Sequence, residues 1–184
     1  MGLSEKELIK GCVEQNALCQ KQVYDLYAGK MLGVCLRYAK NREEAEDIFQ
    51  EAFIKIFQKI DTFRGEAKLS TWMRSVMVNT ALKHLRSNRM KYEFTTENEI
   101  EIAVDPVIPD EAKSLISEEA LLEIIGTLPE GYRVVFNMYN LEGFTHKEIA
   151  AHLEISENTS KSQLSRARKL LQKLVNEKLN EEKK

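Results

Sequence analysis

The chain has 184 residues, with 27 lysines and arginines against 29 aspartates and glutamates, which gives a formal net charge of −2. This length suffices for one domain or two small ones, and 43% apolar with 30% charged residues exclude a chain that is disordered throughout. Three prolines and eight glycines are too few for a typical all-β protein. Because no run approaches the roughly 18 apolar residues of a membrane span and the first ten residues are too polar for a signal peptide, we expect a cytoplasmic, mostly helical protein.

The charge is distributed unevenly along the chain. Residues 1–91 carry a net charge of +5, residues 92–119 carry −8 and residues 120–184 carry +1. The acidic segment also contains Pro106 and Pro109 and has no sustained helical period. A segment of this composition buries too little apolar surface to offset the entropy lost on ordering, so we expect a flexible linker.

This distribution predicts an all-α protein of two small helical domains. We place the N-terminal domain at residues 1–92, the flexible acidic linker at 93–114, and the C-terminal domain, which contains a helix-turn-helix, at 115–184. The alternative is a single domain with a long surface loop, although loops longer than about 15 residues are uncommon inside compact domains.

The three cysteines, Cys12, Cys19 and Cys35, lie early in the chain. An odd number without a Cys-x-x-Cys pair argues against a disulfide framework and a zinc site, and the three histidines are too scattered to suggest another metal site. Cys12 and Cys19 are seven residues apart, which fits one face of one helix, so buried and reduced thiols are expected. We expect no metal and no cofactor.

Two helices are predicted before residue 61. Asn16 precedes a stretch whose apolar and aromatic residues recur at helical spacing: Val23, Leu26, Tyr27, Val34, Cys35 and Tyr38. Asn41 and Glu44 then have the Asn-x-x-Glu form of a capping box, in which each side chain accepts from the other residue's free amide. A strict i, i+3/i+4 stripe follows: Ala45, Ile48, Phe49, Ala52, Phe53, Ile56, Phe57 and Ile60. This stripe predicts a strongly amphipathic helix with these residues in the core.

A second stripe lies on the opposite side of the same predicted helix: Asp47, Gln50, Glu51, Ile54 and Gln58. Taken alone, it is most simply an ordinary solvated face. Paired carboxylates could also indicate acid–base chemistry, but no histidine or group of metal ligands accompanies them, so we do not expect an enzyme.

A loop and a basic helix are predicted next. Phe63-Arg64-Gly65-Glu66 indicates an exposed loop, and a helix from about Ser70 to about Arg89 follows it. At about 100° per residue, one side of this helix is apolar: Met73, Met77, Val78, Ala81 and Leu85. The other side carries Trp72, Ser75, Asn79, Lys83 and Arg86. Such a side suits nucleic-acid binding, because it offers an aromatic surface for stacking, an amide that can hydrogen-bond a base edge and basic groups for phosphates. The alternative is a solvated basic face with Trp72 half-buried against the loop.

The C-terminal domain is predicted to begin with two helices. The first is marked by Leu121, Leu122, Ile124 and Ile125. Pro129 suits the first turn of the second, since its missing N–H would have no helical partner there. The second helix carries Val135, Phe136 and Tyr139, and Gly143 can end it in a left-handed cap.

A helix-turn-helix is predicted after Gly143. Thr145 and Glu148 form a second capping box that opens a short helix, the chain breaks at Glu154, and Ser156 can cap a long helix. The residues of the long helix that face inward are Ser160, Leu164, Ala167, Leu171 and Leu174. Those that face outward are Asn158, Lys161, Ser162, Ser165, Arg168 and Lys169. This pattern is typical of a DNA-binding motif, and the alternative is an ordinary helical hairpin.

Several of these segments resemble bacterial sigma factors. Asp47-Ile48-Phe49-Gln50-Glu51-Ala52-Phe53 is similar to the Asp-x-x-Gln-Glu-x-Phe signature of that family. Similar segments follow in the family's order: Phe63-Arg64-Gly65, Ser70-Thr71-Trp72-Met73, Val78-Asn79, Glu148-Ile149-Ala150, Ile155-Ser156-Glu157 and Lys161-Ser162-Gln163-Leu164-Ser165-Arg166-Ala167-Arg168. Over roughly residues 10–91 and 115–175 the chain therefore resembles the two-domain extracytoplasmic-function class of the sigma-70 family.

The resemblance implies an alternative sigma factor that directs core RNA polymerase to −35/−10 promoters and helps to open the −10 region. Its partners would be the β′ coiled coil and the β flap of the polymerase, promoter DNA and, as a further candidate, an anti-sigma factor, without membrane insertion. The residues assigned to the polymerase are Asp47, Gln50, Glu51 and Ile54. Those assigned to the −10 element are Phe63, Arg64, Lys68, Ser70, Thr71, Trp72, Ser75, Asn79, Lys83 and Arg86. Those assigned to the −35 element, in the major groove, are Glu157, Asn158, Thr159, Lys161, Ser162, Ser165, Arg166 and Arg168.

Three residues depart from the pattern of the family. Glu154 and Asn158 stand where the family usually has glycine, and Ser160 stands in place of a buried valine or isoleucine. A non-glycine residue in a left-handed turn costs about 1 kcal/mol or more, so we expect a looser turn at Glu154. Ser160 is expected to weaken the packing without changing the outer side of the helix.

Two other classes of protein fit part of the sequence. A conventional transcription regulator would bind operators through the C-terminal motif and sense a signal through residues 1–91, but it leaves the basic side at Trp72 and the stripe at Asp47 unexplained. A helical enzyme has no nucleophile–base pair, metal cluster or phosphate loop in its favour. The net charge of −2 agrees with a sigma factor, which needs little non-specific DNA affinity when the polymerase also holds the DNA.

Overall fold

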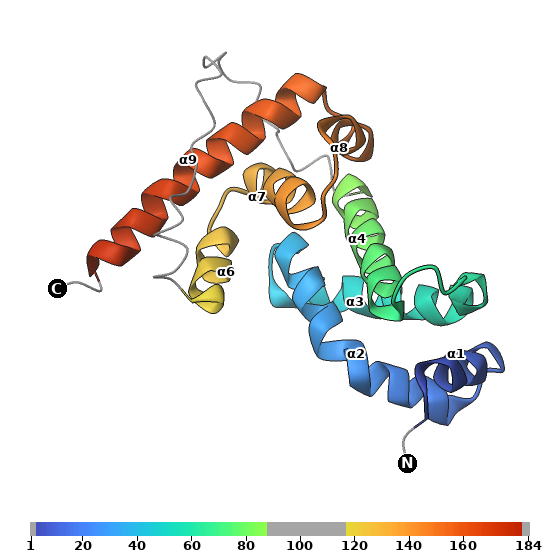
Figure 1. Cartoon of the computed structure of the whole chain (residues 1–184). Helices are drawn as coiled ribbons and strands as arrows, with labels where there is room; N and C mark the ends of the chain where they lie inside the picture. Colours follow the sequence, from blue (N-terminus) through green and yellow to red (C-terminus); the bar gives the residue numbers. More distant parts are fainter. Residues whose placement is uncertain (1–2, 88–116, 182–184) are drawn as a thin grey trace. The chain divides into compact units, whose positions relative to one another are not determined.

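The computed structural model describes residues 3–87 and 117–181, and the regular elements in these two ranges are all helices (Figure 1). The chain divides into two compact units, Met1–Asn88 and Arg89–Lys184. The prediction of an all-α protein with two helical domains is confirmed. The predicted acidic linker, residues 93–114, lies outside the described residues. Within the described ranges, no helix combines the length and the apolar character that a membrane crossing needs.

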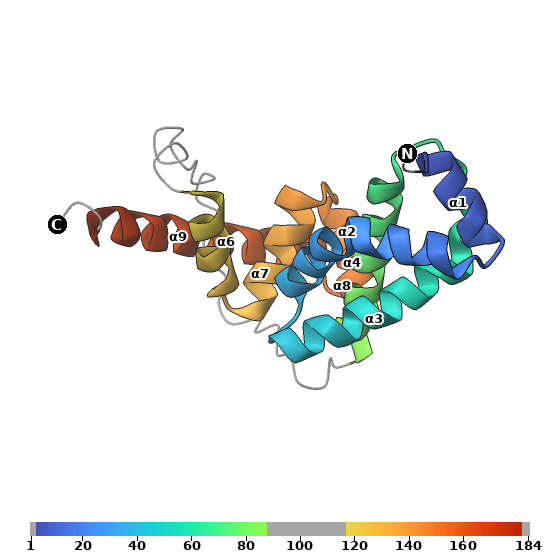
Figure 2. The ribbon, with the colours of Figure 1, turned by 90° about the horizontal axis from the view of Figure 1, so that it is seen from below.

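The described part of the N-terminal unit contains α1 (Glu5–Val13), α2 (Ala17–Tyr38), α3 (Arg42–Lys59), the 3-10 turn η1 (Ile60–Thr62) and α4 (Leu69–Ser87). Helices α2, α3 and α4 pack against one another in pairs, and α1 packs against α2 (Figures 1 and 2). The largest fully buried side chains of this core include Tyr38, Ile48, Ile56, Ile60, Leu69, Met73, Met77 and Leu82. An aromatic cluster joins α2 to α3, since the ring centroids of Tyr24 and Phe49 lie 5.0 and 4.7 Å from that of Phe53.

The apolar stripe predicted between residues 45 and 60 forms the buried side of α3. Seven of its eight residues are buried, and Phe57 is partly exposed. In α2, Leu26 shares the helical spacing of the buried residues Val23 and Val34 but is itself 61% exposed. Helix α2 buries the side that carries Val34. Leu26 lies eight residues before Val34, so at about 100° per residue its side chain points about 80° away from Val34 around the helix axis and leaves the buried side.

The junction of α1 and α2 corrects another prediction. Cys12 lies in α1 and Cys19 in α2, so the two thiols are not on one helix. Between them, Gln15 has a left-handed φ of 60°, and Asn16 caps α2 by accepting from two amides of its first turn, at 2.9 and 3.2 Å. All three thiols are buried and free, as expected. Burial raises the pKa of Cys12 and raises that of Cys35 to about 12.

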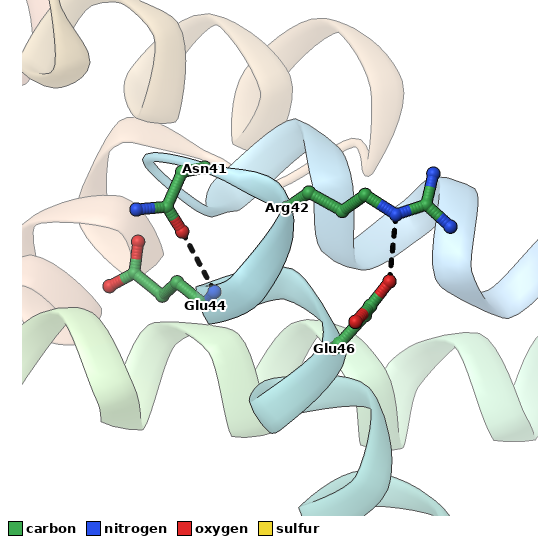
Figure 3. A network of polar contacts seen from close by, with 4 residues as sticks. All are labelled: Asn41, Arg42, Glu44 and Glu46. Carbon is green, nitrogen blue, oxygen red and sulfur yellow. Dashed lines mark hydrogen bonds and ion pairs between the residues drawn. The ribbon is translucent and has the colours of Figure 1, made fainter.

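The start of α3 is capped by only half of the predicted capping box (Figure 3). Asn41 Oδ1 accepts from the Glu44 amide at 2.8 Å, as expected. The Glu44 carboxylate, however, accepts from the amide of Lys40 and not from that of Asn41. It also lies 3.3 Å from His84 Nε2 of α4. Glu44 therefore links the first turn of α3 to the end of α4.

The described part of the C-terminal unit contains α6 (Glu118–Gly126), α7 (Glu130–Phe136), the π-helical turn η3 (Asn137–Leu141), α8 (His146–Leu153) and α9 (Glu157–Glu181). Helices α6, α7 and α8 all pack against α9, which is the long helix of Figure 1. The core of this unit includes Ile125, Val135, Met138, Ile149, Leu164, Ala167 and Leu171.

Two details of this unit differ from the prediction. Pro129 precedes α7 and is not part of its first turn, so the predicted start was one residue early. At the end of α9 the buried residue is Val175, which is 3% exposed, whereas the predicted Leu174 is partly exposed. Leu174 and Val175 lie on opposite edges of the inward side of the helix, so the packing of neighbouring helices determines which of the two side chains is buried. Gly143 has the expected left-handed conformation, with φ 76°.

Candidate partner and nucleic-acid interfaces

The outer side of α3 forms a polar surface, named here the α3 surface, which consists of Asp47, Gln50, Glu51 and Ile54. All four side chains are exposed, and Ile54 is 58% exposed although it is apolar. They lie opposite the buried stripe of α3, as the spacing predicted. The α3 surface thus presents carboxylate and amide groups beside an exposed apolar side chain.

Neighbouring side chains hold Glu51 in place. Its carboxylate accepts from Lys55 Nζ at 2.7 Å, and Lys55 also donates to Thr80 Oγ1 of α4 at 3.3 Å. The hydrogen bond from Lys55, together with the nearby charges of Lys83 and His84, lowers the pKa of Glu51. Glu51 is therefore ionised at neutral pH, and the α3 surface adjoins the basic side of α4 at Lys83.

The residues that the sequence assigned to the −10 element lie on the loop before α4, in the first turn of α4 and along its exposed side. The exposed members are Arg64, Lys68, Thr71, Ser75, Asn79, Lys83 and Arg86, and the partly exposed members are Phe63, Ser70 and Trp72. The apolar side predicted for this helix is buried. Helix α4 begins at Leu69, one residue before the predicted start, and the predicted end near Arg89 lies outside the described residues.

Trp72 packs against this loop. Its ring centroid lies 5.6 Å from that of Phe63, with the ring planes at 52°. Gly65, two residues after Phe63, has a φ of 74°, a conformation that glycine adopts without steric cost. The contact is the half-buried arrangement that the sequence left as an alternative. Because Trp72 is only partly buried, the rest of its side chain stays accessible beside the basic residues of α4.

Both helices of the helix-turn-helix begin at the predicted caps. Thr145 Oγ1 accepts from the Glu148 amide at 3.3 Å, and the Glu148 carboxylate accepts from the Thr145 amide at 2.8 Å, which completes the capping box. The amide and the hydroxyl of Thr145 both donate to Glu148 and lower its pKa. At the start of α9, Ser156 Oγ accepts from the Thr159 amide at 2.9 Å. These caps fix where α8 and α9 begin.

The residues assigned to the −35 element all lie in the N-terminal half of α9. Glu157, Asn158 and Lys161 are exposed, and Thr159, Ser162, Ser165, Arg166 and Arg168 are partly exposed. Arg168 is oriented by η3, because its Nη2 donates to Asn140 Oδ1 at 3.3 Å and its guanidinium lies 5.6 Å from the Tyr139 ring centroid. This contact was not predicted, because it joins residues 28 positions apart.

Ser160 forms a polar link between the two helices of the motif. It is fully buried, and its Oγ lies 2.9 Å from His146 Nδ1 of α8. The His146 ring in turn stacks on Tyr139, with centroids 4.7 Å apart and planes at 26°. The expectation that Ser160 only weakens packing therefore needs a correction, because its hydroxyl joins α8 to α9 by a hydrogen bond.

A groove between α2 and α3 was not predicted. It has a volume of about 280 Å³ and includes Gln50 of the α3 surface in its lining. Helical periodicity cannot indicate such a groove, because its shape depends on how two helices pack. As for metals, no group of three or more histidine, cysteine, aspartate or glutamate side chains within residues 3–87 and 117–181 is arranged to hold an ion.

Comparison with known proteins gives consistent matches along the chain. The family described as Sigma-70 region 2 matches residues 23–90, and the family described as Sigma-70, region 4 matches residues 118–171. The RNA polymerase sigma-H factor of Pseudomonas aeruginosa is 31% identical over 182 residues, covering 92% of this chain and 94% of the relative. The ECF RNA polymerase sigma factor SigW of Bacillus subtilis is 31% identical over 177 residues, covering 91% and 92%. The structure of the sigma factor RpoE with the anti-sigma factor NepR from Bartonella quintana has a TM-score of 0.48 at 22% identity, covering 85% of this chain and 96% of that one.

Proposed function

Because the chain belongs to the extracytoplasmic-function (ECF) class of the sigma-70 family, and is an alternative sigma factor that directs RNA polymerase to promoters, we propose that its three exposed surfaces share this task. The α3 surface binds the polymerase, the loop and outer side of α4 act on the −10 element, and the outer side of α9 reads the −35 element. One observation carries this assignment: every residue of the three sets is exposed or partly exposed, and none belongs to the buried core of its unit. Their polar groups contribute little to the core and are available to partners.

The partner proposed for the α3 surface is the β′ coiled coil. Asp47 and Glu51 present two carboxylates, Gln50 presents an amide, and Ile54 adds apolar area. The ion pair with Lys55 restricts the Glu51 side chain before binding, so less conformational entropy is lost in the complex. A helical partner with basic and apolar residues complements this surface.

The loop at Phe63 and the outer side of α4 are proposed to read and open the −10 element. A base that leaves the duplex needs a pocket to hold it out of the stack. The packed rings of Phe63 and Trp72 supply a firm wall for such a pocket. On the same side of α4, Asn79 can read a base edge, and Lys83 can hold phosphates of the adjoining duplex.

The N-terminal half of α9 is proposed to enter the major groove at the −35 element. Asn158 and Lys161 lie near the start of the helix, where a recognition helix contacts base edges. Arg168 lies further along and is held by Tyr139 and Asn140, which suits a phosphate contact of fixed orientation.

The remaining parts of the proposal follow from the same function. We assign the polymerase and −10 contacts to residues 1–92, the linker to 93–114 and the −35 contact to 115–184, with the β flap as a second polymerase contact for the C-terminal domain. An anti-sigma factor would inhibit the protein by covering the α3 surface. RNA synthesis is the chemistry of the polymerase, so the protein acts without an enzymatic activity of its own. It acts together with the polymerase in the cytoplasm.

The test of the proposal is the double variant Asp47→Ala with Gln50→Ala. Both side chains are exposed, so the variant should fold and melt like the parent protein, while its affinity for core polymerase falls. Circular dichroism and a titration with core polymerase measure the two quantities. Asn176→Ala with Glu177→Ala is the control, because it removes the same kinds of group from exposed positions of α9 beyond the region 4 match. Undiminished affinity of the first variant would make the α3 surface an ordinary solvated face.

A further inference from the structure

The groove between α2 and α3 is built mostly from apolar groups. Helix α2 contributes Tyr24, Ala28, Gly29 and Leu32. Helix α3 contributes Glu46, Phe49 and Gln50. A cavity of about 150 Å³ can hold benzene, so the groove, at about 280 Å³, has room for one large aliphatic or aromatic side chain.

The walls of the groove are held by the core. Phe49 is buried, and the Tyr24 ring lies 5.8 Å from it and 5.0 Å from Phe53, so Tyr24 is fixed although it is 43% exposed. The α2 wall is open at Gly29, because a Cβ placed there would meet nothing within 4 Å. The groove is therefore a feature of the packed unit that does not need a partner to form.

The groove is continuous with the α3 surface. Gln50 belongs to both, and Asp47 lies on the next turn of the same helix side. The rim is acidic: Glu46, which pairs with Arg42 at 2.7 Å (Figure 3), lines the groove, and Asp47 stands beside it. A helix that lies along the α3 surface would thus have the groove within reach and would meet carboxylates around it.

We propose that this groove is the apolar anchor site of the polymerase interface. It takes one large apolar side chain from the β′ coiled coil, and basic residues next to that side chain pair with Asp47 and Glu51. Large side chains that fill a pocket and are surrounded by other contacts carry much of the binding energy in protein interfaces. The inference rests on the proposed function and adds to it a specific pocket and the kind of side chain that fills it.

The test fills the groove without touching the α3 surface. Gly29→Leu places a side chain at the open edge of the groove, and Gly33→Leu is the matched control: Gly33 is exposed on the same helix, has nothing within 4 Å of its Cβ position and does not line the groove. Replacing glycine inside a helix favours the helix, so both variants should melt at or above the temperature of the parent.

We expect Gly29→Leu to weaken binding of core polymerase by about tenfold or more, the effect of losing one anchor contact, and Gly33→Leu to leave binding unchanged. Equal losses in both variants, or normal binding by a folded Gly29→Leu, would overturn the groove proposal. If Asp47→Ala with Gln50→Ala lowers the affinity while Gly29→Leu does not, the groove proposal fails and the α3 surface stands. If only Gly29→Leu lowers it, the groove binds the polymerase, but the α3 surface fails and with it the proposed pairing of basic residues with Asp47 and Glu51.

A photo-crosslink identifies the occupant directly. p-Benzoylphenylalanine in place of Tyr24 keeps an aromatic ring at the groove and reacts with a neighbouring C–H bond on irradiation. In holoenzyme, the proposal expects the crosslink on the β′ subunit, within its coiled coil. A crosslink on another subunit, on another part of β′ or on a second copy of this chain would overturn it.

Discussion

Removal of the Trp72 side chain tests the role proposed for this residue in opening the −10 region. In the structure Trp72 is partly buried in the first turn of α4, with its ring centroid 5.6 Å from that of Phe63. The basic side of α4 continues from it to Asn79 and Lys83. We expect Trp72→Ala to leave closed-complex binding nearly normal and to slow the opening of the −10 region, whether Trp72 stacks on a base or braces the loop.

The aromatic contacts of Trp72 set the size of this effect. An aromatic pair contributes about 0.5–1.5 kcal/mol beyond its buried area, and stacking on a base contributes about 1–3 kcal/mol. A loss of about 2 kcal/mol slows opening roughly thirtyfold at room temperature. Replacing a fully buried tryptophan by alanine lowers the free energy of unfolding by about 3–5 kcal/mol. The loss for Trp72→Ala should be smaller, because Trp72 is partly exposed.

Permanganate reactivity of −10 thymines measures opening, and thermal melting of the free protein measures stability. Trp72→Phe is the matched control, since it keeps a ring against Phe63 and should keep most of the opening rate. A promoter already mismatched across the −10 region should restore most of the activity of Trp72→Ala, because the cost of unpairing is removed. Normal opening by a stable Trp72→Ala would refute both the stacking and the bracing role. An equal loss of all functions with a lowered melting temperature would make Trp72 a core residue only.

Four further variants test the C-terminal unit. Ser160→Ala removes a buried hydrogen bond between α8 and α9 and should lower the free energy of unfolding by about 1 kcal/mol, measured by thermal melting; an unchanged melt would contradict the link. Lys161→Ala or Arg168→Ala should weaken −35 binding, and loss of the phosphate contact of Arg168 should make the logarithmic salt dependence shallower by about 0.9, measured by footprinting with holoenzyme across salt concentrations; unaltered protection at every salt concentration would disprove the outer side of α9 as the DNA contact. The pKa of Glu148 is lowered from its ordinary 4.5 by bonds from Thr145, so the stability it contributes is present above 4.5 and is lost as pH falls through its lowered value. Glu148→Gln should remove this acid-dependent part, and equal pH profiles of parent and variant in chemical denaturation would contradict it.

The sequence predicted the helices best where the apolar period was strong. The stripe from Ala45 to Ile60 placed α3 correctly because eight apolar residues agree on one direction. The break between Cys12 and Cys19 was missed, since seven residues also fit two helical turns. Signals for it were present: Asn16 is a helix cap, and Ser4 with Glu7 forms a complete capping box that starts α1.

The candidate surfaces were predictable as helix sides, and their supporting contacts were not. The spacing placed Asp47, Gln50 and Glu51 opposite the core, and the structure shows all three exposed. The contact of Arg168 with Asn140 joins segments 28 residues apart, so it depends on how η3 packs beside α9. The α2–α3 groove depends in the same way on the packing of two helices, and no pattern along one helix specifies it.

The turn of the helix-turn-helix shows how local strain and tertiary contacts combine. Glu154 adopts the left-handed conformation that its position predicted, with φ 53° and ψ 43°, at a cost of about 1 kcal/mol. The turn is nonetheless closed, because the amides of Glu154 and Ile155 both donate to the Ala150 carbonyl. The buried hydrogen bond between Ser160 and His146, worth about 1 kcal/mol, offsets a cost of that size. Glu154 therefore strains the turn, while Ser160 joins the two helices of the same motif by a hydrogen bond, and the angle between α8 and α9 depends on a contact between helices as well as on the turn.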